Sequence, residues 1–199
     1  GIIQADVAGR LHHTSDLLGK PVIGDWVMCQ PRVDEQRATI HAVLPRTTCF
    51  VRKAVGKRSR AQVIAANIDV AFLVMTMGTD FNLSRLERYL ALATESGAKP
   101  VILLTKADLH PDDIEPIVSA GEACWPGTEL QVVSALEGKG LDQITAYLTG
   151  HRTGVMLGSS GAGKSTLLNA LMETAHAVTG PVSDHEERGR HTTTHRELV

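Results

Sequence analysis

Hydrophobic residues follow two different patterns along the chain. Up to about residue 50, apolar and polar positions alternate over 22–31 and 37–45, and turn residues separate these runs. Alternation of this kind predicts short β-strands with one covered face, so we expect a small antiparallel β domain in this region. No helical periodicity interrupts it.

From Asn67 onward, the apolar residues form short continuous runs. These runs cover residues 69–76, 100–105, 130–135 and 153–158. They are typical of strands buried on both faces of a parallel sheet. Helices are predicted over 84–97, 112–124 and 140–149. The alternation of strand and helix predicts right-handed crossovers and a doubly wound α/β sheet.

The helix predicted over 84–97 has the clearest boundaries. Ser84 and Glu87 have the spacing of a capping box, and Gly97 is typical of a helix end. One face of this helix carries Leu86, Leu90 and Ala93. We therefore expect that face to pack on the sheet.

Composition and charge limit the domain organisation. The 199 residues are 43% hydrophobic, which is enough to bury a core, and the formal net charge is −2. The chain as a whole is no polycation, so a nucleic-acid surface would have to come from local clustering. We predict a β domain over 1–51, a basic linker over 52–66 and an α/β domain over 67–199.

One local cluster of positive charge exists. No acidic residue occurs between Gln36 and Ile68, whereas seven lysines and arginines do. Six of these residues are candidates for an RNA-facing surface: Arg46, Arg52, Lys53, Lys57, Arg58 and Arg60. A solvated basic linker is the alternative interpretation of the same run.

The cysteines and the apolar runs bear on the cellular compartment. Cys29, Cys49 and Cys124 are far apart and form no Cys-x-x-Cys pair, so we expect reduced thiols and no zinc site in this chain. No run approaches the roughly 18 apolar residues of a membrane span. We predict a soluble, cytoplasmic protein without a membrane partner.

The strongest single motif matches the phosphate-binding pattern G-x-x-x-x-G-K-[ST], and a strand before it and a helix after it give the required context. Its residues are Gly158, Ser159, Ser160, Gly161, Ala162, Gly163, Lys164, Ser165 and Thr166. The backbone N–H groups would surround a phosphate chain at a helix N-terminus. Lys164 would neutralise the β- and γ-phosphates, and the Ser165 hydroxyl would bind Mg²⁺.

A base-recognition site is predicted where two successive strands end, because ligands collect at that edge of such sheets. Its residues are Thr105, Lys106, Ala107 and Asp108 after one strand and Ser134 and Ala135 after the next. The Asp108 carboxylate can accept two N–H bonds from guanine, which adenine cannot supply. The alkyl stem of Lys106 can lie along the ring. Polar pairing of this kind discriminates steeply, so we expect a guanine nucleotide.

A polar segment rich in His, Arg and Thr follows the P-loop helix over 183–199. It is either a plain exposed loop or the switch loop of a GTPase, in which one threonine binds Mg²⁺ and senses the γ-phosphate. Thr194 is our candidate for that threonine, with Thr193 as the alternative. The four-residue spacing of His191 and His195 in a loop does not define a metal site.

These motifs together resemble a known family. They occur in the order TKAD at 105–108, SAL at 134–136, GSSGAGKS at 158–165 and GRHTTT at 189–194. This order is similar to that of the circularly permuted RsgA (YjeQ) GTPases, which assist maturation of the bacterial small ribosomal subunit. GDWV at 24–27 also resembles the OB-fold strand of that family.

The resemblance implies a small β-barrel of the OB-fold type followed by an α/β P-loop GTPase domain with circularly permuted motif order. It implies Mg²⁺-dependent hydrolysis of GTP to GDP and phosphate, stimulated by the 30S subunit, and binding to 16S rRNA. A C-terminal zinc-binding domain is also implied. We expect the protein to act as a monomer.

Three departures from the family pattern stand out. Thr105 replaces the usual Asn, so an amide that helps to hold base and loop is lost; we expect weaker nucleotide affinity, with Asp108 keeping the guanine preference. The Asp-x-x-Gly segment that follows the switch threonines in the family is missing, and so is a zinc-ligating cluster. We therefore expect this chain to be part of a longer protein, with both domains incomplete at their outer ends.

The predicted mechanism relies on Lys164, Mg²⁺ and backbone N–H groups that stabilise charge on the phosphates. No glutamine stands in an obvious place to orient the attacking water, so His191 is our hypothesis for that role. A P-loop ATPase is one alternative, but it leaves Asp108 and Ser134 without a function. A nucleotide-gated RNA-binding checkpoint module with little catalysis of its own is the other.

Overall fold

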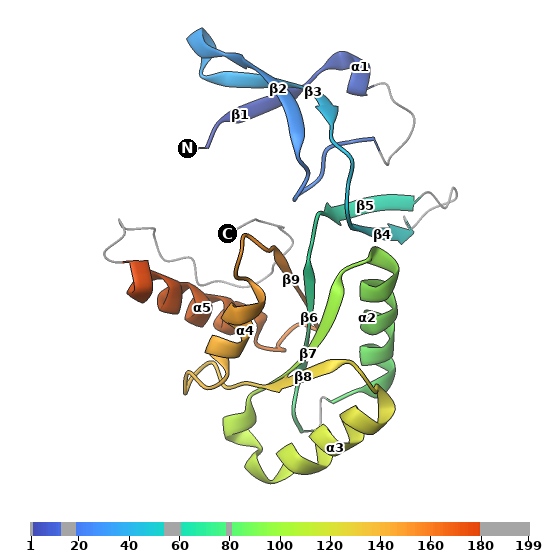
Figure 1. Cartoon of the computed structure of the whole chain (residues 1–199), viewed down its shortest axis with the longest axis vertical. Coiled ribbons are helices and arrows are strands. Elements are labelled where there is room, and N and C mark those ends of the chain that lie inside the picture. Colours follow the sequence, from blue (N-terminus) through green and yellow to red (C-terminus); the bar gives the residue numbers. More distant parts are fainter. Residues whose placement is uncertain (1, 13–18, 54–60, 79–80, 180–199) are drawn as a thin grey trace. The chain divides into compact units, whose positions relative to one another are not determined.

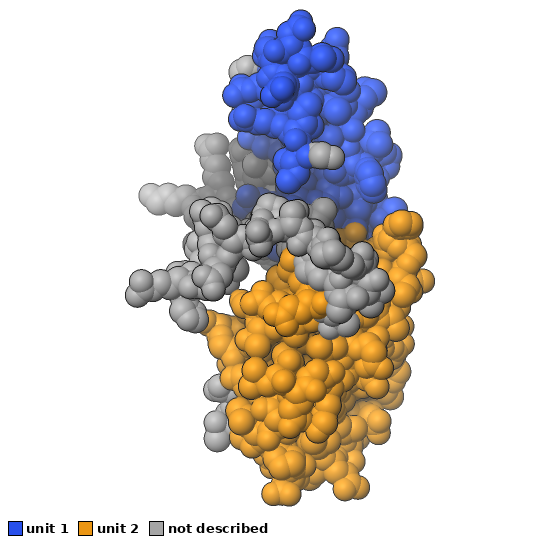
Figure 2. Space-filling model, turned by 90° about the vertical axis from the view of Figure 1, so that its left-hand side faces the viewer, with its two compact units in different colours: residues 1–68, 193–199 blue, residues 69–192 orange. Residues whose placement is uncertain are grey.

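The computed structural model of the chain describes residues 2–12, 19–53, 61–78 and 81–179. These residues form two compact units, which divide between Ile68 and Asp69. Figure 1 shows the secondary structure and Figure 2 the two units in different colours. The division falls two residues after the boundary predicted at residue 66, so the chain leaves the first unit shortly before the central strand of the second.

The N-terminal unit contains two small sheets. Strands β1 (Gln4–Val7), β3 (Arg37–Val43) and β2 (Val27–Arg32) form one sheet in that order, and β4 (Cys49–Lys53) pairs with β5 (Ala61–Ala66). β2 and β3 are antiparallel as predicted, but β1 runs parallel to β3. The prediction of a wholly antiparallel domain is therefore wrong, because side-chain alternation is the same for either direction of pairing.

Two short helical turns also occur in this unit, α1 (Gly9–His12) and the 3-10 turn η1 (Val33–Glu35). Elements of three or four residues are too short for periodicity to reveal. Among the described residues, the strands form two separate ladders, so the closed barrel of an OB-fold stays a prediction.

The segment over 52–66, expected to be a linker, contains the end of β4 and all of β5 in its described part; residues 54–60 lie outside the described residues. Val63, Ala65 and Ala66 of β5 are buried, as is Phe50 of the paired strand. The described part of this window is therefore not a plain linker, because the apolar residues of β5 pair with β4 and are buried.

The C-terminal unit contains a four-stranded parallel sheet in the order β8-β7-β6-β9. Its strands are β6 (Val70–Thr76), β7 (Lys99–Thr105), β8 (Glu129–Val132) and β9 (Gly154–Leu157). All residues of β6 are buried, in agreement with its central place. The interpretation of continuous apolar runs as parallel strands is confirmed.

Helices cover both faces of this sheet, with α2 and α3 on one face and α4 and α5 on the other (Figure 1). They are α2 (Leu83–Ser96), α3 (Ile114–Cys124), α4 (Leu141–Tyr147) and α5 (Lys164–Thr179), and the 3-10 turns η2 (Ala107–Leu109) and η3 (Pro111–Asp113) follow β7. The core on the α4 and α5 face includes Val70, Phe72, Val74, Val101, Leu103, Leu141, Ile144 and Leu167. None of the helices in the described ranges is long and apolar enough to cross a membrane.

The N-terminus of α2 differs from the predicted capping box. Asn82 caps the helix in place of Ser84, and its Oδ1 accepts the N–H of Arg85 at 2.9 Å. The helix begins at Leu83, so Ser84 already lies within its first turn. The prediction of the stop is confirmed, since Gly97 adopts a left-handed φ of 85° and its N–H donates to the carbonyl of Thr94.

Candidate nucleotide-binding site

The carboxyl ends of the parallel strands bring the predicted site residues to one edge of the sheet. Thr76 of β6 lies opposite Thr105 of β7, and Leu104 lies opposite Val132 of β8. β9, on the other side of β6, ends at Leu157, directly before the P-loop. The loops after β7, β8 and β9 therefore share the edge at which open α/β sheets bind ligands.

The P-loop has the backbone that a phosphate cradle requires. Gly161 and Gly163 have φ values of 79° and 86°, a left-handed conformation that glycine adopts without cost. A Cβ added at Gly158 would lie 2.6 Å from the carbonyl oxygen of Val74, so glycine is needed for the loop to approach β6. The space around the Cβ position of Gly161 is open, which leaves room for a ligand.

Lys164 stands at the first residue of α5 and reaches back over the loop. Its Nζ donates to the carbonyls of Gly158 at 2.9 Å and Ser159 at 2.7 Å. Burial lowers the pKa of this ammonium group, because desolvation disfavours its charged form. The partners that hold it in the described part of the chain are neutral carbonyls, so its charge is available to an anion.

Thr105 connects the base-recognition loop with the P-loop. Its buried hydroxyl lies 2.9 Å from the carbonyl oxygen of Ala162 and 3.1 Å from that of Met75. One hydroxyl has a single proton to donate, and the shorter distance favours Ala162. The Thr105 hydroxyl thus contacts the P-loop directly, and the weaker nucleotide affinity expected from the missing amide stays a prediction.

Asp108 and Ser134 meet as the sequence predicts. The hydroxyl of Ser134, a fully buried residue, donates to Oδ1 of Asp108 at 2.6 Å and accepts the N–H of Glu137 at 3.2 Å. Ser134 and Lys139 also exchange two backbone hydrogen bonds, which close the turn between them. This turn holds the Asp108 carboxylate by Oδ1, and among the described residues no hydrogen bond to Oδ2 competes with a ligand.

The sequence reasoning missed the contribution of Glu137 and Lys139 to this turn. The signal was present in Gly138 and Gly140, which flank Lys139 and have φ values of 70° and 77°. A Cβ at Gly140 would lie 2.8 Å from the carbonyl oxygen of Val132. Two glycines around one residue directly after a strand predict a tight turn.

Lys106 and Ala107 complete the described base-recognition loop. Lys106 has a φ of 60°, which is uncommon outside glycine and is typical of functional turns. The N–H of Ala107 donates to the carbonyl of Val133 at 3.4 Å, so the loops after β7 and β8 are joined by backbone as well as by side chains. Ala135, the last predicted residue, packs against the core.

The residues predicted to bind Mg²⁺ are described only in part. Ser165 is exposed in the first turn of α5, and its hydroxyl oxygen is a ligand that suits this hard cation beside phosphate oxygens. Thr193, Thr194 and His191 lie outside the described residues. In the described ranges, no group of three His, Cys, Asp or Glu side chains could hold a metal ion.

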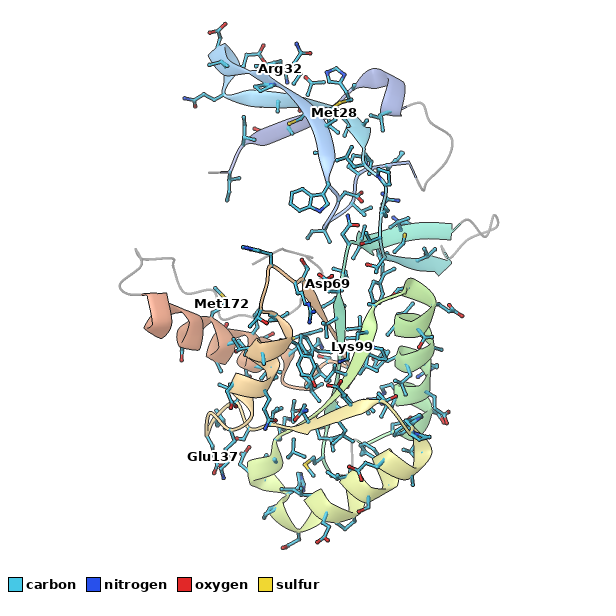
Figure 3. All side chains as sticks on the ribbon, in the orientation of Figure 1. Met28, Arg32, Asp69, Lys99, Glu137 and Met172 are labelled. Carbon is cyan, nitrogen blue, oxygen red and sulfur yellow. The ribbon has the colours of Figure 1, made fainter. Side chains whose placement is uncertain are left out.

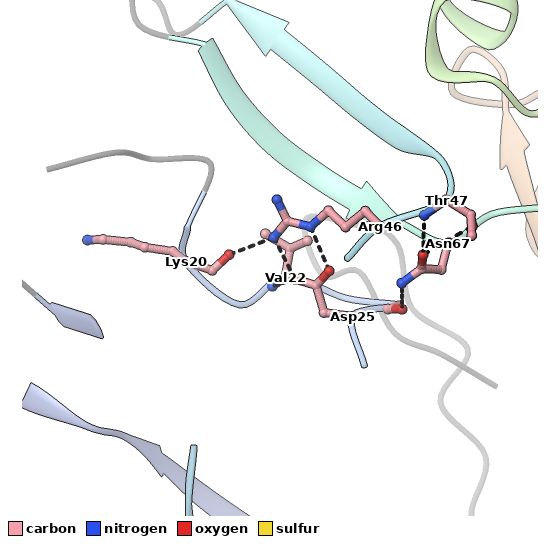
Figure 4. Close-up of polar contacts among 7 residues, drawn as sticks. Lys20, Val22, Asp25, Arg46, Thr47 and Asn67 are labelled. Carbon is pink, nitrogen blue, oxygen red and sulfur yellow. Dashed lines mark hydrogen bonds and ion pairs between the residues drawn. The ribbon is translucent and has the colours of Figure 1, made fainter. Parts of the chain in front are cut away.

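Arg46, a candidate for the RNA-facing surface, is committed to the interior of the N-terminal unit. Its Nε and Nη2 donate to the two carboxylate oxygens of Asp25, each at 2.7 Å, and Nη2 also donates to the carbonyl of Lys20 at 2.9 Å. Figure 4 shows this ion pair, in which 13% of the Arg46 and 1% of the Asp25 side chain is exposed. A structural role explains Arg46 better than contact with RNA.

The other RNA-facing candidates are described in part or not at all. Arg52 and Lys53 lie in β4, and only their backbone is described. Lys57, Arg58 and Arg60 fall outside the described residues. Their contact with RNA stays a prediction.

The comparison with known proteins decides which family has this site. A family model described as RsgA GTPase matches residues 43–199. The small ribosomal subunit biogenesis GTPase RsgA of Opitutus terrae is 45% identical over 210 residues, which cover 100% of this chain and 56% of the relative. The chain belongs to the RsgA GTPase family. The RsgA of Streptomyces coelicolor is 43% identical over 201 residues, covering 100% of this chain and 54% of the relative.

Two solved structures are also similar to the chain. The crystal structure of YjeQ from Thermotoga maritima has a TM-score of 0.67 and 27% identity, covering 84% of this chain and 55% of that one. YloQ, described as a circularly permuted GTPase, has a TM-score of 0.63 and 28% identity, covering 88% and 57%. The predicted resemblance to the RsgA family and the permuted motif order are confirmed. The chain spans about half the length of the RsgA relatives it matches.

Proposed function

We propose that this chain binds guanine nucleotides and hydrolyses GTP as part of a factor in maturation of the small ribosomal subunit. The observation that carries this proposal is that hydrogen bonds join the loops after β7, β8 and β9. Thr105 donates to the P-loop carbonyl of Ala162, and Ser134 donates to Asp108. A preorganised carboxylate beside a phosphate cradle fits a guanine nucleotide, because it fixes base and phosphates with little ordering cost. The names of the RsgA relatives support the same activity and the same partner.

In the proposed mechanism, the chain's own residues bind and orient the nucleotide. Backbone N–H groups from Gly161 to Thr166 surround the phosphates at the start of α5, and Lys164 turns its ammonium group from two carbonyls to the phosphate oxygens. Ser165 would hold Mg²⁺, which neutralises charge on the phosphates when it is bound. We propose that Thr194, or Thr193, completes this site and that His191 orients the attacking water.

The proposed partners follow from the same family membership. The N-terminal unit would be an OB-fold that contacts 16S rRNA in the 30S subunit, and the protein would act as a monomer in the cytoplasm. Zinc belongs only to a separate C-terminal domain, which the resemblance implies and which stays a prediction. A checkpoint module with little catalysis would bind nucleotide through the same residues, so turnover distinguishes it from a GTPase.

The decisive test is a change of base specificity. Asp108→Asn is expected to weaken binding of GDP by at least about 10²-fold and to favour xanthine nucleotides, whose altered edge pairs with the amide. The measurement is competition of GDP, XDP and ADP against a fluorescent guanine nucleotide, followed by single-turnover hydrolysis of GTP. If ADP competes as well as GDP with the parent chain, the guanine assignment is wrong and the ATPase interpretation gains support.

A further inference from the structure

Three exposed apolar side chains lie on one face of the N-terminal sheet. Trp26 is 70% exposed, Met28 is 57% exposed and Leu44 is 46% exposed. Trp26 directly precedes β2 and Met28 is its second residue, so the alternation of an extended chain points both to the same side of the sheet. The N–H of Leu44 donates to the carbonyl of Trp26 at 2.8 Å, which places Leu44, directly after β3, opposite Trp26. We call these three residues the Trp26 face.

The register of the sheet limits this face. Met28 pairs with Ala42, and an irregularity between Met28 and Cys29 shifts the pairing, so that Cys29 pairs with Ile40. Such a bulge changes the direction of the following side chains. The Trp26 face therefore ends at Met28, which Figure 3 labels on β2. A tryptophan is highly buried on average, so one with most of its surface exposed beside two other apolar residues indicates a contact surface.

The charge of the N-terminal unit indicates the kind of partner. Residues 1–68 contain ten lysines and arginines against five aspartates and glutamates, whereas residues 69–199 contain ten against seventeen. The positive charge of this otherwise acidic chain is thus concentrated in the part that carries the Trp26 face. Such asymmetry is typical of an attraction to nucleic acid.

Three acidic residues of the N-terminal unit are held in ion pairs. Asp25, next to Trp26, is held by Arg46. Asp6 and Glu35 of the same unit form ion pairs with Arg32. Few free carboxylates therefore remain in the described part of the unit to repel a phosphate backbone.

We propose that the Trp26 face binds single-stranded RNA by stacking an unpaired base on the indole ring, with Met28 and Leu44 beside it. Aromatic side chains on a sheet of a basic domain bind single strands in this way, because every base has a flat face to stack. The inference rests on the proposed ribosomal function and adds to it the residues and the form of RNA that they contact. The proposed RNA contact is thus the Trp26 face and not Arg46, and the charge pattern of the sequence did not predict this surface.

The sequence offers a direct reporter for this contact. It contains two tryptophans, and Trp125 lies in the other unit at the end of α3. In the Trp125→Phe chain, Trp26 is the only source of indole fluorescence. Addition of a 12-residue oligouridylate is expected to quench this emission to saturation. A duplex RNA of the same length and heparin are expected to bind, if at all, without the same quenching, because neither offers an unpaired base.

Substitution separates stacking from charge attraction. Trp26→Ala is expected to weaken oligouridylate binding at least about fivefold, the lower range for loss of one stacked base, and to leave the salt dependence unchanged because no phosphate contact is removed. Trp26→Phe is expected to retain most of the affinity. Leu83→Ala, which truncates an exposed leucine of the other unit, is the matched control and is expected to have no effect.

Several results would overturn the proposal. One is an unchanged affinity of Trp26→Ala; another is Trp26 emission that is shielded from acrylamide in the free chain, which shows that other residues cover the face. Loss of binding to the small subunit with unchanged oligouridylate binding would identify a protein contact instead. Normal GTP hydrolysis in the same samples distinguishes failure of this inference from failure of the proposed function, and unchanged thermal unfolding shows that each variant is folded.

Discussion

The hydroxyl of Thr105 lies 2.9 Å from the main-chain carbonyl oxygen of Ala162, although the two residues are 57 positions apart in the chain. Thr105 ends the strand that leads to the base-recognition loop, and Ala162 is the buried residue of the P-loop. One hydrogen bond thus joins the two parts of the site that would hold the base and the phosphates.

Removal of the Thr105 hydroxyl is expected to loosen the P-loop. Thr105→Val keeps the shape of the side chain but leaves a buried carbonyl without this donor, which costs about 1–3 kcal/mol in the free energy of unfolding. Nucleotide affinity is expected to fall because the loop is less preorganised. Urea denaturation and binding of a fluorescent GDP measure the two effects.

Thr105→Asn and Thr105→Ser are the matched variants. Each retains a donor at this position, so each is expected to bind GDP at least as well as Thr105→Val and to unfold at a higher urea concentration. Equal GDP affinity of Thr105→Val and the parent chain would contradict a role of this hydrogen bond in nucleotide binding.

Lys164 is expected to increase nucleotide affinity and not to stabilise the folded chain. Lys164→Met removes a charge-assisted contact with the phosphates, which is worth about 1.5–3 kcal/mol, so GDP affinity is expected to fall at least about tenfold. Burial lowers the pKa of Lys164, because desolvation destabilises the charged ammonium group in the nucleotide-free protein. Thermal unfolding of the nucleotide-free variant is therefore expected at the parent's temperature or above.

Lys99→Met is the control for this substitution. Lys99 begins β7, at the edge of the sheet opposite to the P-loop, and pairs with Glu129. Its loss is expected to leave GDP affinity unchanged. A parallel decrease in both variants would mean that overall charge, and not the contact of Lys164, determines binding.

The buried ion pair of Arg46 and Asp25 is expected to stabilise the N-terminal unit strongly. Arg46→Ala leaves the carboxylate of Asp25, 1% exposed, without its partner, and such a loss costs about 3–5 kcal/mol. The free energy of unfolding in urea measures this cost. Arg32→Ala removes exposed ion pairs with Asp6 and Glu35 and is expected to cost about 1 kcal/mol at most, so equal effects of the two variants would contradict a special role of burial.

The pH dependence of stability is expected to include a contribution from Glu129. Hydrogen bonds from Lys99 and Tyr147 lower the pKa of this carboxyl below its ordinary value in the folded state. Its stabilising effect is thus fully present above the unfolded pKa and is lost as the pH falls through the lowered folded pKa. Thermal unfolding of Glu129→Gln is expected to differ from the parent at pH 7 and to approach it in acid; a constant difference across this range would contradict the assignment.

Much of the α/β unit could be predicted because its signals are local. Continuous apolar runs such as that of β6 identify buried parallel strands, and the strand before the P-loop and the helix after it follow from the motif at 158–166. The placement of Asp108 and Ser134 at one edge was also predictable, since residues after adjacent parallel strands meet there, but the hydrogen bond between them was not. In the N-terminal unit, the same reasoning found β2 and β3 but not the parallel pairing of β1, because alternation carries no information on strand direction.

The sequence by itself determined the motifs, their permuted order and the edge of the sheet at which they gather, since each depends on residue type and on neighbours along the chain. Only the tertiary structure decided which groups remote in sequence contact each other. In the folded chain, the hydroxyl of Thr105 binds the P-loop carbonyl of Ala162, and the guanidinium of Arg46 binds the carboxylate of Asp25. Hydrogen bonds and ion pairs depend on distances of a few ångströms between residues remote in sequence, and those distances exist only once the chain has packed.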